Sequence, residues 1–299
     1  MKRLKIAVGP HAHLEPLRDG RVTSSLVEFD FADHPVISRA FAPMVERQAF
    51  DVSEIALGAF LQAHAAGKPL ALLPAVEVGG FHHAYLRRLA ASDPVPLTEV
   101  SGGTLGSRSY SQTTGLWVRA ILAEQFGVDL DTITWLTQEA AHSAGYTDPP
   151  NVRRDPQARS TPDLLDAGEI VAAVIGPEIE GTVPVLPDPT AAADEWFAEH
   201  RTVGINHMIC LTHEVCQDAD VVAEVYRMIT ESHALVLGAA EDRELLPGVP
   251  GAVREGVERV RAAFDLGARY ARDQRMIPSA PRLDEVLPES LRDAGGSRA

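Results

Sequence analysis

The chain is predicted to be an α/β protein with two lobes and a ligand cleft between them. Short apolar runs alternate with helical patterns, which is typical of largely parallel sheets covered by helices. The length of 299 residues exceeds the usual size of one domain, and a 45% hydrophobic content suffices for a large core. The order of the patterns assigns residues 1–96 and 204–299 to a discontinuous first lobe, and residues 97–203 to an inserted second lobe.

Five elements are predicted before the insert. They are a strand over residues 4–8, an extended stretch over 22–31, helices over 37–48 and 55–66, and a strand within 69–78. The segment Asp51-Val52-Ser53-Glu54 resembles a cap before the second helix, and Gly67 can end that helix. Pro74 indicates that the last strand lies at a sheet edge or ends there.

The insert and the return to the first lobe follow the same alternation. Strands are predicted over 104–108, 132–137, 170–176 and 204–212. Helices are predicted over 112–126, 191–200, 219–237 and 251–275. A polar loop is predicted over 143–160 and a polar tail after 291. Thr161-Pro162-Asp163 is a further helix start, with Pro at the first helical position. A cleft between two such lobes is a favoured ligand site, at strand carboxyl ends and helix N-termini.

The charge and the ends of the chain limit the function classes. A formal charge of -15 argues against nucleic acid and against an anionic membrane surface as partners. No apolar run approaches the roughly 18 residues of a membrane span. The basic start MKRLK is followed by too short an apolar run for a secretory signal, so a cytoplasmic protein is expected. Cys210 and Cys216 form neither a disulfide framework nor a CxxC site.

The segment SRSYSQTTGLWVRAIL, residues 107–122, is rich in hydroxyl groups directly before a helical pattern. A helix N-terminus has free N–H groups and a partial positive charge, so it favours a carboxylate or phosphate. One capping residue would not explain all the polar side chains at this start, which favours an anion site over simple capping. The candidate ligand-binding residues are Arg108, Tyr110, Gln112, Thr113 and Thr114. Trp117 is either a wall of the pocket or a core residue.

Three histidines near predicted strand ends are further candidates. His207 and Asn206 lie on the strand that returns from the insert to the first lobe, where strands line the cleft. A lone His in an apolar strand is more often a core residue, so both interpretations stay open for His207. His82 and His83 follow a predicted strand, and one of them is expected to reach the ligand. Adjacent residues of a strand point to opposite faces, so this pair is not expected to share a metal.

Weaker signals complete the set of candidates. His11 and His13 could share one face and bind a metal, and Glu139 and His142 could reach the cleft or be ordinary surface groups. The chain contains no HExxH, GxGxxG, Walker or GxSxG motif, so hydride and phosphoryl transfer have no support.

Several motifs resemble those of the 4,5-dihydroxyphthalate decarboxylase family, which is similar in fold to type II periplasmic binding proteins. The most specific is RSYSQTTGLWVR over 108–119; the others are FDFAD over 29–33, FDVSE over 50–54, LPAV over 73–76 and INHM over 205–208. The chain differs at 9–13, GPHAH, where the family is expected to carry a tyrosine and an Arg-Thr-like pair.

The resemblance implies a carboxy-lyase that acts on a hydroxylated aromatic acid such as a dihydroxyphthalate, in aromatic compound metabolism. The helix start with Arg108, Thr113 and Thr114 would hold one carboxylate, and a histidine would protonate the ring carbon from which CO2 leaves. His207, His82 and His83 are the candidate proton donors, and Glu139 is a further candidate for proton transfer. His11, Asn206, Trp117 and His142 are candidate substrate contacts.

Two other functions remain open at this point. The first is a solute-binding protein for a small aromatic carboxylate, because one fold hosts unrelated functions. The second is another transformation of a related acid, which a metal at His11, His13 and a carboxylate would favour. We expect no cofactor, with a divalent metal ion as the alternative. The expected partner is a small aromatic carboxylate, and a homo-oligomer is left open.

Overall fold

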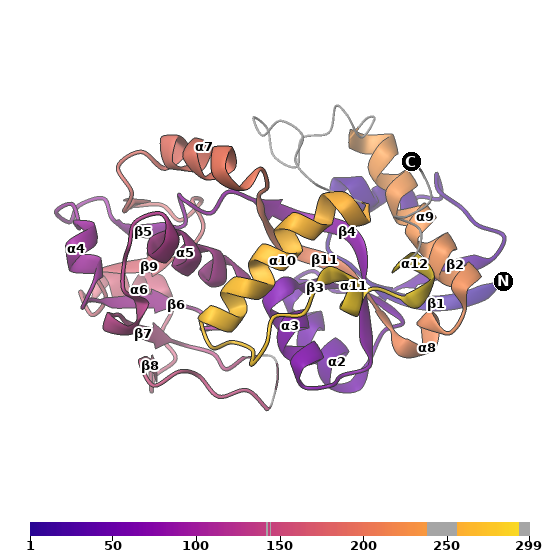
Figure 1. The fold of residues 1–299 in the computed structure, drawn as a ribbon, viewed down its shortest axis with the longest axis horizontal. Helices are drawn as coiled ribbons and strands as arrows, with labels where there is room; N and C mark the ends of the chain where they lie inside the picture. Colours follow the sequence, from indigo (N-terminus) through magenta and orange to yellow (C-terminus); the bar gives the residue numbers. More distant parts are fainter. Residues whose placement is uncertain (142, 144, 238–255, 293–299) are drawn as a thin grey trace.

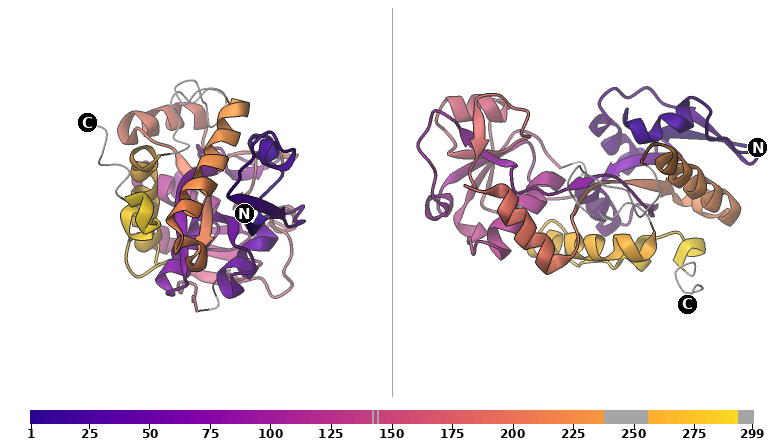
Figure 2. Two further views of the ribbon diagram at one scale, coloured as in Figure 1. Left: turned by 90° about the vertical axis from the view of Figure 1, so that its right-hand side faces the viewer. Right: turned by 90° about the horizontal axis from the view of Figure 1, so that it is seen from above.

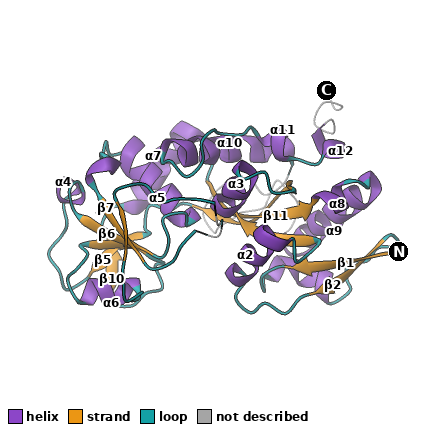
Figure 3. Cartoon of the chain, turned by 90° about the horizontal axis from the view of Figure 1, so that it is seen from below, coloured by secondary structure: helices purple, strands orange, loops and turns teal. Residues whose placement is uncertain are grey.

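The computed structural model describes residues 1–141, 143, 145–237 and 256–292. It consists of two α/β lobes arranged along the long axis of the molecule, with the N-terminus at the far end of the first lobe (Figure 1). Each lobe has its own sheet with helices around it, as Figure 3 shows. The two-lobed α/β architecture predicted from the sequence is therefore confirmed.

The first lobe is built on a five-stranded sheet. Its order is β2 (Val27–Phe31), β1 (Lys2–Ala7), β3 (Val52–Ala56), β11 (Gly204–Thr212) and β4 (Leu70–Gly80). β1 is parallel to β2 and β3, whereas β11 is antiparallel to both β3 and β4. The carboxyl ends of β1, β3 and β4 and the amino end of β11 therefore meet at one edge of the sheet.

Helices cover this sheet and bury its apolar side chains. They are η1 (Ala12–Leu14), α1 (Glu15–Arg18), α2 (Ser38–Arg47), α3 (Leu57–Ala65), α8 (His213–Cys216) and α9 (Ala219–Leu237). One core cluster joins β1 to α9 through residues such as Ile6 and Val222. A larger cluster contains Phe60 of α3 and also reaches residues of the second lobe, such as Trp117. The two lobes thus share part of their core.

The second lobe has a six-stranded sheet. Its order is β10 (Thr182–Pro184), β5 (Leu86–Leu89), β9 (Ala172–Val174), β6 (Thr104–Ser107), β7 (Thr134–Thr137) and β8 (Val152–Arg154). Its helices are α4 (Leu97–Val100), α5 (Thr113–Glu124), η2 (Leu130–Thr132), α6 (Thr161–Asp166) and α7 (Pro189–His200). α6 starts with a capping box between Ser160 and Asp163, at the predicted helix start. β6, β7, β8 and β9 are parallel, so α5 starts at the carboxyl edge of β6.

The division of the chain at residue 96 needs a correction. β5 pairs with β9 and β10, so the chain has already entered the second sheet at Leu86. The C-terminal segment holds α10 (Val257–Asp273), α11 (Leu283–Val286) and α12 (Glu289–Arg292). α10 runs along both lobes (Figure 2) and contacts α5 as well as β11 and α3. α10 therefore connects the lobes, whereas α11 packs on β4 and α12 on α9 in the first lobe.

The predicted cap at Asp51 to Glu54 is wrong, because these residues enter a strand. The Asp51 carboxylate accepts a hydrogen bond from the backbone N–H of Lys5 at 2.7 Å, so it joins β1 to β3 instead of starting a helix. Residues 251–255 of the last predicted long helix lie outside the described residues. Among the helices that the structure describes, none has the length and apolar character needed to cross a membrane.

Candidate functional site

The N-termini of two helices, one from each lobe, face one pocket. α3 begins at the carboxyl end of β3, and α5 begins just beyond the carboxyl end of β6. The Thr113 hydroxyl accepts a hydrogen bond from the backbone N–H of Gly58 at 2.9 Å, so a side chain of the second lobe caps the first-lobe helix. Neither helix has a cap from its own N-cap side chain. Two partial positive charges therefore converge on this region.

The close approach of the lobes depends on a glycine. A Cβ atom added at Gly58 would lie 2.6 Å from the carbonyl oxygen of Ser111, which is too close for any other residue without a backbone shift. Ser109 and Ser111 are buried, and their hydroxyl oxygens lie 3.0 Å apart. The hydroxyl groups of this segment thus join the lobes and each other rather than cap α5.

The pocket has a volume of about 80 Å³. Its lining consists of Ser38, Phe41, Ala56, Ala59, Arg108, Ser109, Ser111, Gln112, Thr113, Thr114, Asn206 and His207. Sites that enclose drug-sized ligands usually measure about 300–1,000 Å³. A small ligand therefore fits this pocket as it stands, and a larger one would require the lobes to separate.

The buried carboxylate of Glu54 contacts the imidazole ring of His207. The Nδ1 atom of His207 lies 2.6 Å from the Oε1 atom of Glu54, and the glutamate side chain is 0% exposed. Burial by itself would raise the pKa of Glu54, but hydrogen bonds from His11 and His207 outweigh it and hold this pKa at about 2. An ionised Glu54 can accept a hydrogen bond only, so it requires a proton on Nδ1 of His207.

The second oxygen of Glu54 is also occupied. Oε2 accepts a hydrogen bond from the backbone N–H of Gly9 at 2.8 Å and lies 3.0 Å from Nε2 of His11. Burial opposes protonation of His11, but the Glu54 carboxylate more than offsets this effect, so the pKa of His11 is raised. His11 therefore contacts Glu54 and does not line the pocket.

Six predicted site residues line the pocket together: Arg108, Gln112, Thr113, Thr114, Asn206 and His207. Asn206 also bridges the lobes, because its amide nitrogen lies 3.4 Å from the Thr114 hydroxyl. Its amide oxygen lies 2.7 Å from Nε2 of His82. His82 is thus a neighbour of a pocket residue rather than part of the lining.

Tyr110 and Trp117 are core residues. The Tyr110 hydroxyl donates to the carbonyl oxygen of Gln274, and the Arg119 guanidinium lies 3.9 Å from the centre of its ring. Trp117 donates from Nε1 to the carbonyl oxygen of Ile205 at 2.8 Å, and it is 1% exposed. The sequence left the role of Trp117 open, and the structure shows the core alternative.

His82 and His83 are both buried, and neither lines the pocket. The His82 ring is stacked on Trp117, and the Nε2 atom of His83 lies 3.1 Å from the side-chain oxygen of Gln125. Burial lowers the pKa of each imidazole to about 4. Both rings are therefore neutral at pH 7, which makes them poor proton donors.

Glu139 and His142 do not add to the pocket lining. Glu139 is half exposed and forms an ion pair of 2.8 Å with the Arg108 guanidinium. His142 lies outside the described residues. Arg108 consequently offers its charge to the pocket while it is already paired with one carboxylate.

Three residues of the site region, Glu54, Ser38 and Phe41, were not predicted from the sequence. Phe41 packs edge-on against the ring of His207, with ring centres 5.2 Å apart. The only signal for Glu54 is a carboxylate within the otherwise apolar segment VSEIALGAF. A charged residue in a buried strand needs a partner, but periodicity does not say which residue provides it.

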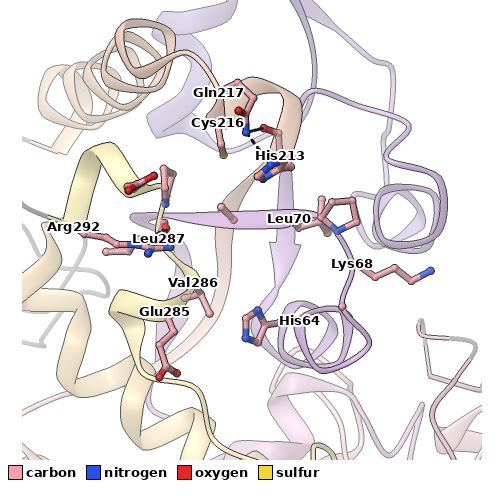
Figure 4. A pocket seen from close by; sticks show the side chains of 15 residues that line it. His64, Lys68, Leu70, His213, Cys216, Gln217, Glu285, Val286, Leu287 and Arg292 are labelled. Atoms are coloured by element: carbon pink, nitrogen blue, oxygen red, sulfur yellow. Dashed lines mark hydrogen bonds between the residues drawn. The ribbon is translucent and has the colours of Figure 1, made fainter.

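A second pocket of about 370 Å³ lies at the amino end of β4 (Figure 4). It is lined by the start of β4, by α8 and by α11 and α12, with His64, Lys68, His213 and Arg292 among its polar residues. Parallel strands offer ligand sites at their carboxyl ends, and this pocket lies at the amino end of β4. We therefore take the smaller pocket between the lobes as the candidate site.

Two curated proteins are similar to the chain in sequence. The 4,5-dihydroxyphthalate decarboxylase of Comamonas testosteroni is 27% identical over 232 residues, which cover 69% of this chain and 67% of that protein. The enzyme of the same name from Pseudomonas putida is 26% identical over 221 residues, covering 65% of this chain and 81% of that protein. No protein-family model matches the chain.

Solved structures of low sequence identity show the fold. The aliphatic sulphonate binding protein SsuA from Escherichia coli is 14% identical with a TM-score of 0.60, covering 98% of this chain and 99% of that chain. The desulfurization enzyme DszB is 13% identical with a TM-score of 0.53, covering 98% of this chain and 99% of that chain. The predicted fold, similar to periplasmic binding proteins, is thereby confirmed. The resemblance to the 4,5-dihydroxyphthalate decarboxylase family, predicted from the motifs, is also confirmed, by the two curated relatives.

Proposed function

We propose that the chain is a decarboxylase that acts on a hydroxylated aromatic carboxylic acid in the pocket between the lobes. The observation that carries the proposal is His207, which faces the pocket with one ring nitrogen held by a buried, ionised carboxylate. The names of the two curated relatives support the reaction class, and a dihydroxyphthalate-like acid is the proposed substrate.

The pocket supplies the contacts that such a substrate needs. The starts of α3 and α5 offer N–H groups and positive dipole ends to a carboxylate, and Thr114 adds a hydroxyl donor. Arg108 adds a guanidinium at the same wall, which would bind a substrate carboxylate while it shares its charge with Glu139. A dicarboxylate would anchor one group there while the other departs.

His207 then acts as the general acid. Its Nε2 proton is transferred to the ring carbon that carries the departing carboxylate, and the electrons of the breaking C–C bond return to the ring as CO2 leaves. A ring hydroxyl ortho or para to this carbon stabilises the protonated intermediate. The imidazole regains its proton from solvent, and Glu54 holds the ring in place by its contact with Nδ1. These reaction steps need no organic cofactor.

A second candidate function is passive binding of a small carboxylate. It is favoured by the fold, because SsuA from Escherichia coli is a binding protein. The same fold also occurs in a desulfurization enzyme, so the fold alone does not distinguish the two functions. A passive binder has no requirement for a histidine supported by a buried glutamate.

Incubation with a panel of hydroxylated benzoates and phthalates tests the proposal, with CO2 release and ligand binding measured in parallel. The decarboxylase proposal predicts CO2 release from at least one hydroxylated acid. Tight binding of an acid without CO2 release from any of them would favour the binding protein instead.

A further inference from the structure

A second buried glutamate of the first lobe, Glu77, is contacted by two histidines. Glu77 of β4 lies with its Oε2 atom 2.8 Å from Nε2 of His13 and 3.2 Å from Nε2 of His233. His13 comes from η1 and His233 from α9, so three separate elements meet at this carboxylate. We propose that His13, Glu77 and His233 form a binding site for a divalent transition metal of the zinc class.

The spacing of the three side chains fits a metal. Their ligand atoms all lie within 4.8 Å of one another. Zinc binds histidine nitrogen and carboxylate oxygen at about 2.0–2.2 Å, so neighbouring ligands of a tetrahedral site are about 3.3 Å apart. The His233 distance of 3.2 Å is close to this value, and the His13 distance of 2.8 Å would have to lengthen by about 0.5 Å. Two imidazoles and one carboxylate also match the preferences of zinc and its neighbours better than those of magnesium or calcium.

The burial of the cluster argues against an ordinary surface contact. The side chains of Glu77 and His233 are 0% exposed, and that of His13 is 12% exposed. Both rings face the same carboxylate oxygen, while Oε1 of Glu77 is buried with no hydrogen-bond partner among the described residues. A buried acceptor without a partner is costly, and a metal bound by both carboxylate oxygens would satisfy it.

Contacts of neighbouring residues already hold the proposed ligands in place. The Ser232 hydroxyl, next to His233, donates to the carbonyl oxygen of His13 at 2.7 Å and joins α9 to η1. The His13 ring also stacks on His11, with ring centres 5.1 Å apart, and His11 contacts Glu54. None of the three proposed ligands lines the pocket. A metal here would fix the position of η1. Because His13 stacks on His11, the metal would also fix the contact between His11 and Oε2 of Glu54.

The spacing of His11 and His13 in the sequence was compatible with a metal shared by these two residues. The two rings instead stack in parallel and contact different glutamates, His11 on Glu54 and His13 on Glu77. The proposed site therefore keeps His13 and replaces His11 by His233. It does not depend on the decarboxylase activity, and its test needs no substrate.

The test is zinc binding to the full chain after removal of metals by a chelator. Stoichiometry is measured by elemental analysis after dialysis, and affinity by titration against a competing chelator. Wild type should bind one zinc ion per chain and should melt at a higher temperature with zinc than without it. His13→Gln should bind more than about 100-fold more weakly, because even the loss of outer-shell partners costs about 10–100-fold in affinity.

His200→Gln is the matched control. His200 belongs to the other described group with metal spacing, Glu124, Glu199 and His200, which is more exposed. The control should bind zinc as wild type does. The proposal is overturned if wild type binds no zinc, or if His13→Gln binds as tightly as wild type. It is also overturned if the bound zinc is lost in the His200 variant instead. His233→Gln repeats the test on a second ligand, and far-ultraviolet circular dichroism in chelator verifies that each variant is folded.

Discussion

Replacement of Glu54 by Gln tests directly whether the carboxylate that contacts Nδ1 of His207 is needed for turnover. The change keeps the size of the side chain but removes the charge that both His11 and His207 contact. The pKa of Glu54 lies at about 2 instead of 4.5, which corresponds to roughly 3 kcal/mol of preference for the ionised form. A neutral amide offers little of this interaction and no longer requires a proton on Nδ1 of His207.

The expected result is a loss of turnover with a smaller loss of binding. A positioned general acid contributes about 10²–10⁴-fold to the rate, and kcat for decarboxylation should fall within this range. KM should change less, because Glu54 does not line the pocket. The free energy of unfolding at pH 7 should also fall by about 1–3 kcal/mol, since the Gly9 N–H loses a charged acceptor.

The control is Glu46→Gln, which removes one negative charge from the same lobe. Glu46 contacts Lys68 at 2.8 Å, and neither residue lines the pocket between the lobes. This variant should keep wild-type kcat. The reasoning is refuted if Glu54→Gln folds normally and turns over an accepted substrate at the wild-type rate.

Three further predictions concern the junction of the lobes and the pH. Thr113→Val removes the cap of α3 at Gly58, so urea unfolding should show a loss of about 1 kcal/mol; an unchanged midpoint would contradict this. Gly58→Ala should clash with Ser111 and cost about 1–3 kcal/mol, with a lower kcat, whereas wild-type values of both would contradict the close approach. Because the folded pKa of Glu54 is depressed to about 2, its contribution to stability is full above pH 4.5 and is lost as the pH falls toward 2. Thermal melts should thus show the gap between wild type and Glu54→Gln closing across this range, and a constant gap would contradict it.

The sequence predicted those parts of the fold that depend on local patterns. Apolar runs and helix starts are local signals, and they identified β1, β11, α5 and the alternation of two lobes. Strand β3 was mistaken for a helix cap because Asp51 and Ser53 are typical capping residues. Only the pairing of Asp51 with Lys5 of another strand shows its true role, and such long-range contacts leave no local pattern.

The sequence predicted several residues that line the candidate pocket, but it did not predict the buried glutamate beside it. The helix start at Thr113 and the strand residues Asn206 and His207 were found because backbone geometry places them at strand and helix ends. Tyr110 was assigned to ligand binding because it lies in the same segment, but its hydroxyl points to Gln274 in a distant part of the chain. Glu54 was missed because its partners are separated from it by 43 and 153 residues.

The most direct test of the central claim compares wild type with His207→Gln on an accepted hydroxylated aromatic acid, with CO2 release and substrate affinity measured on the same preparations. Gln retains hydrogen-bonding groups but has no titratable proton to transfer near neutral pH. The account predicts that the variant binds the acid with an affinity within about tenfold of wild type and releases CO2 about 10²–10⁴-fold more slowly. Wild-type CO2 release by a folded His207→Gln variant would contradict it.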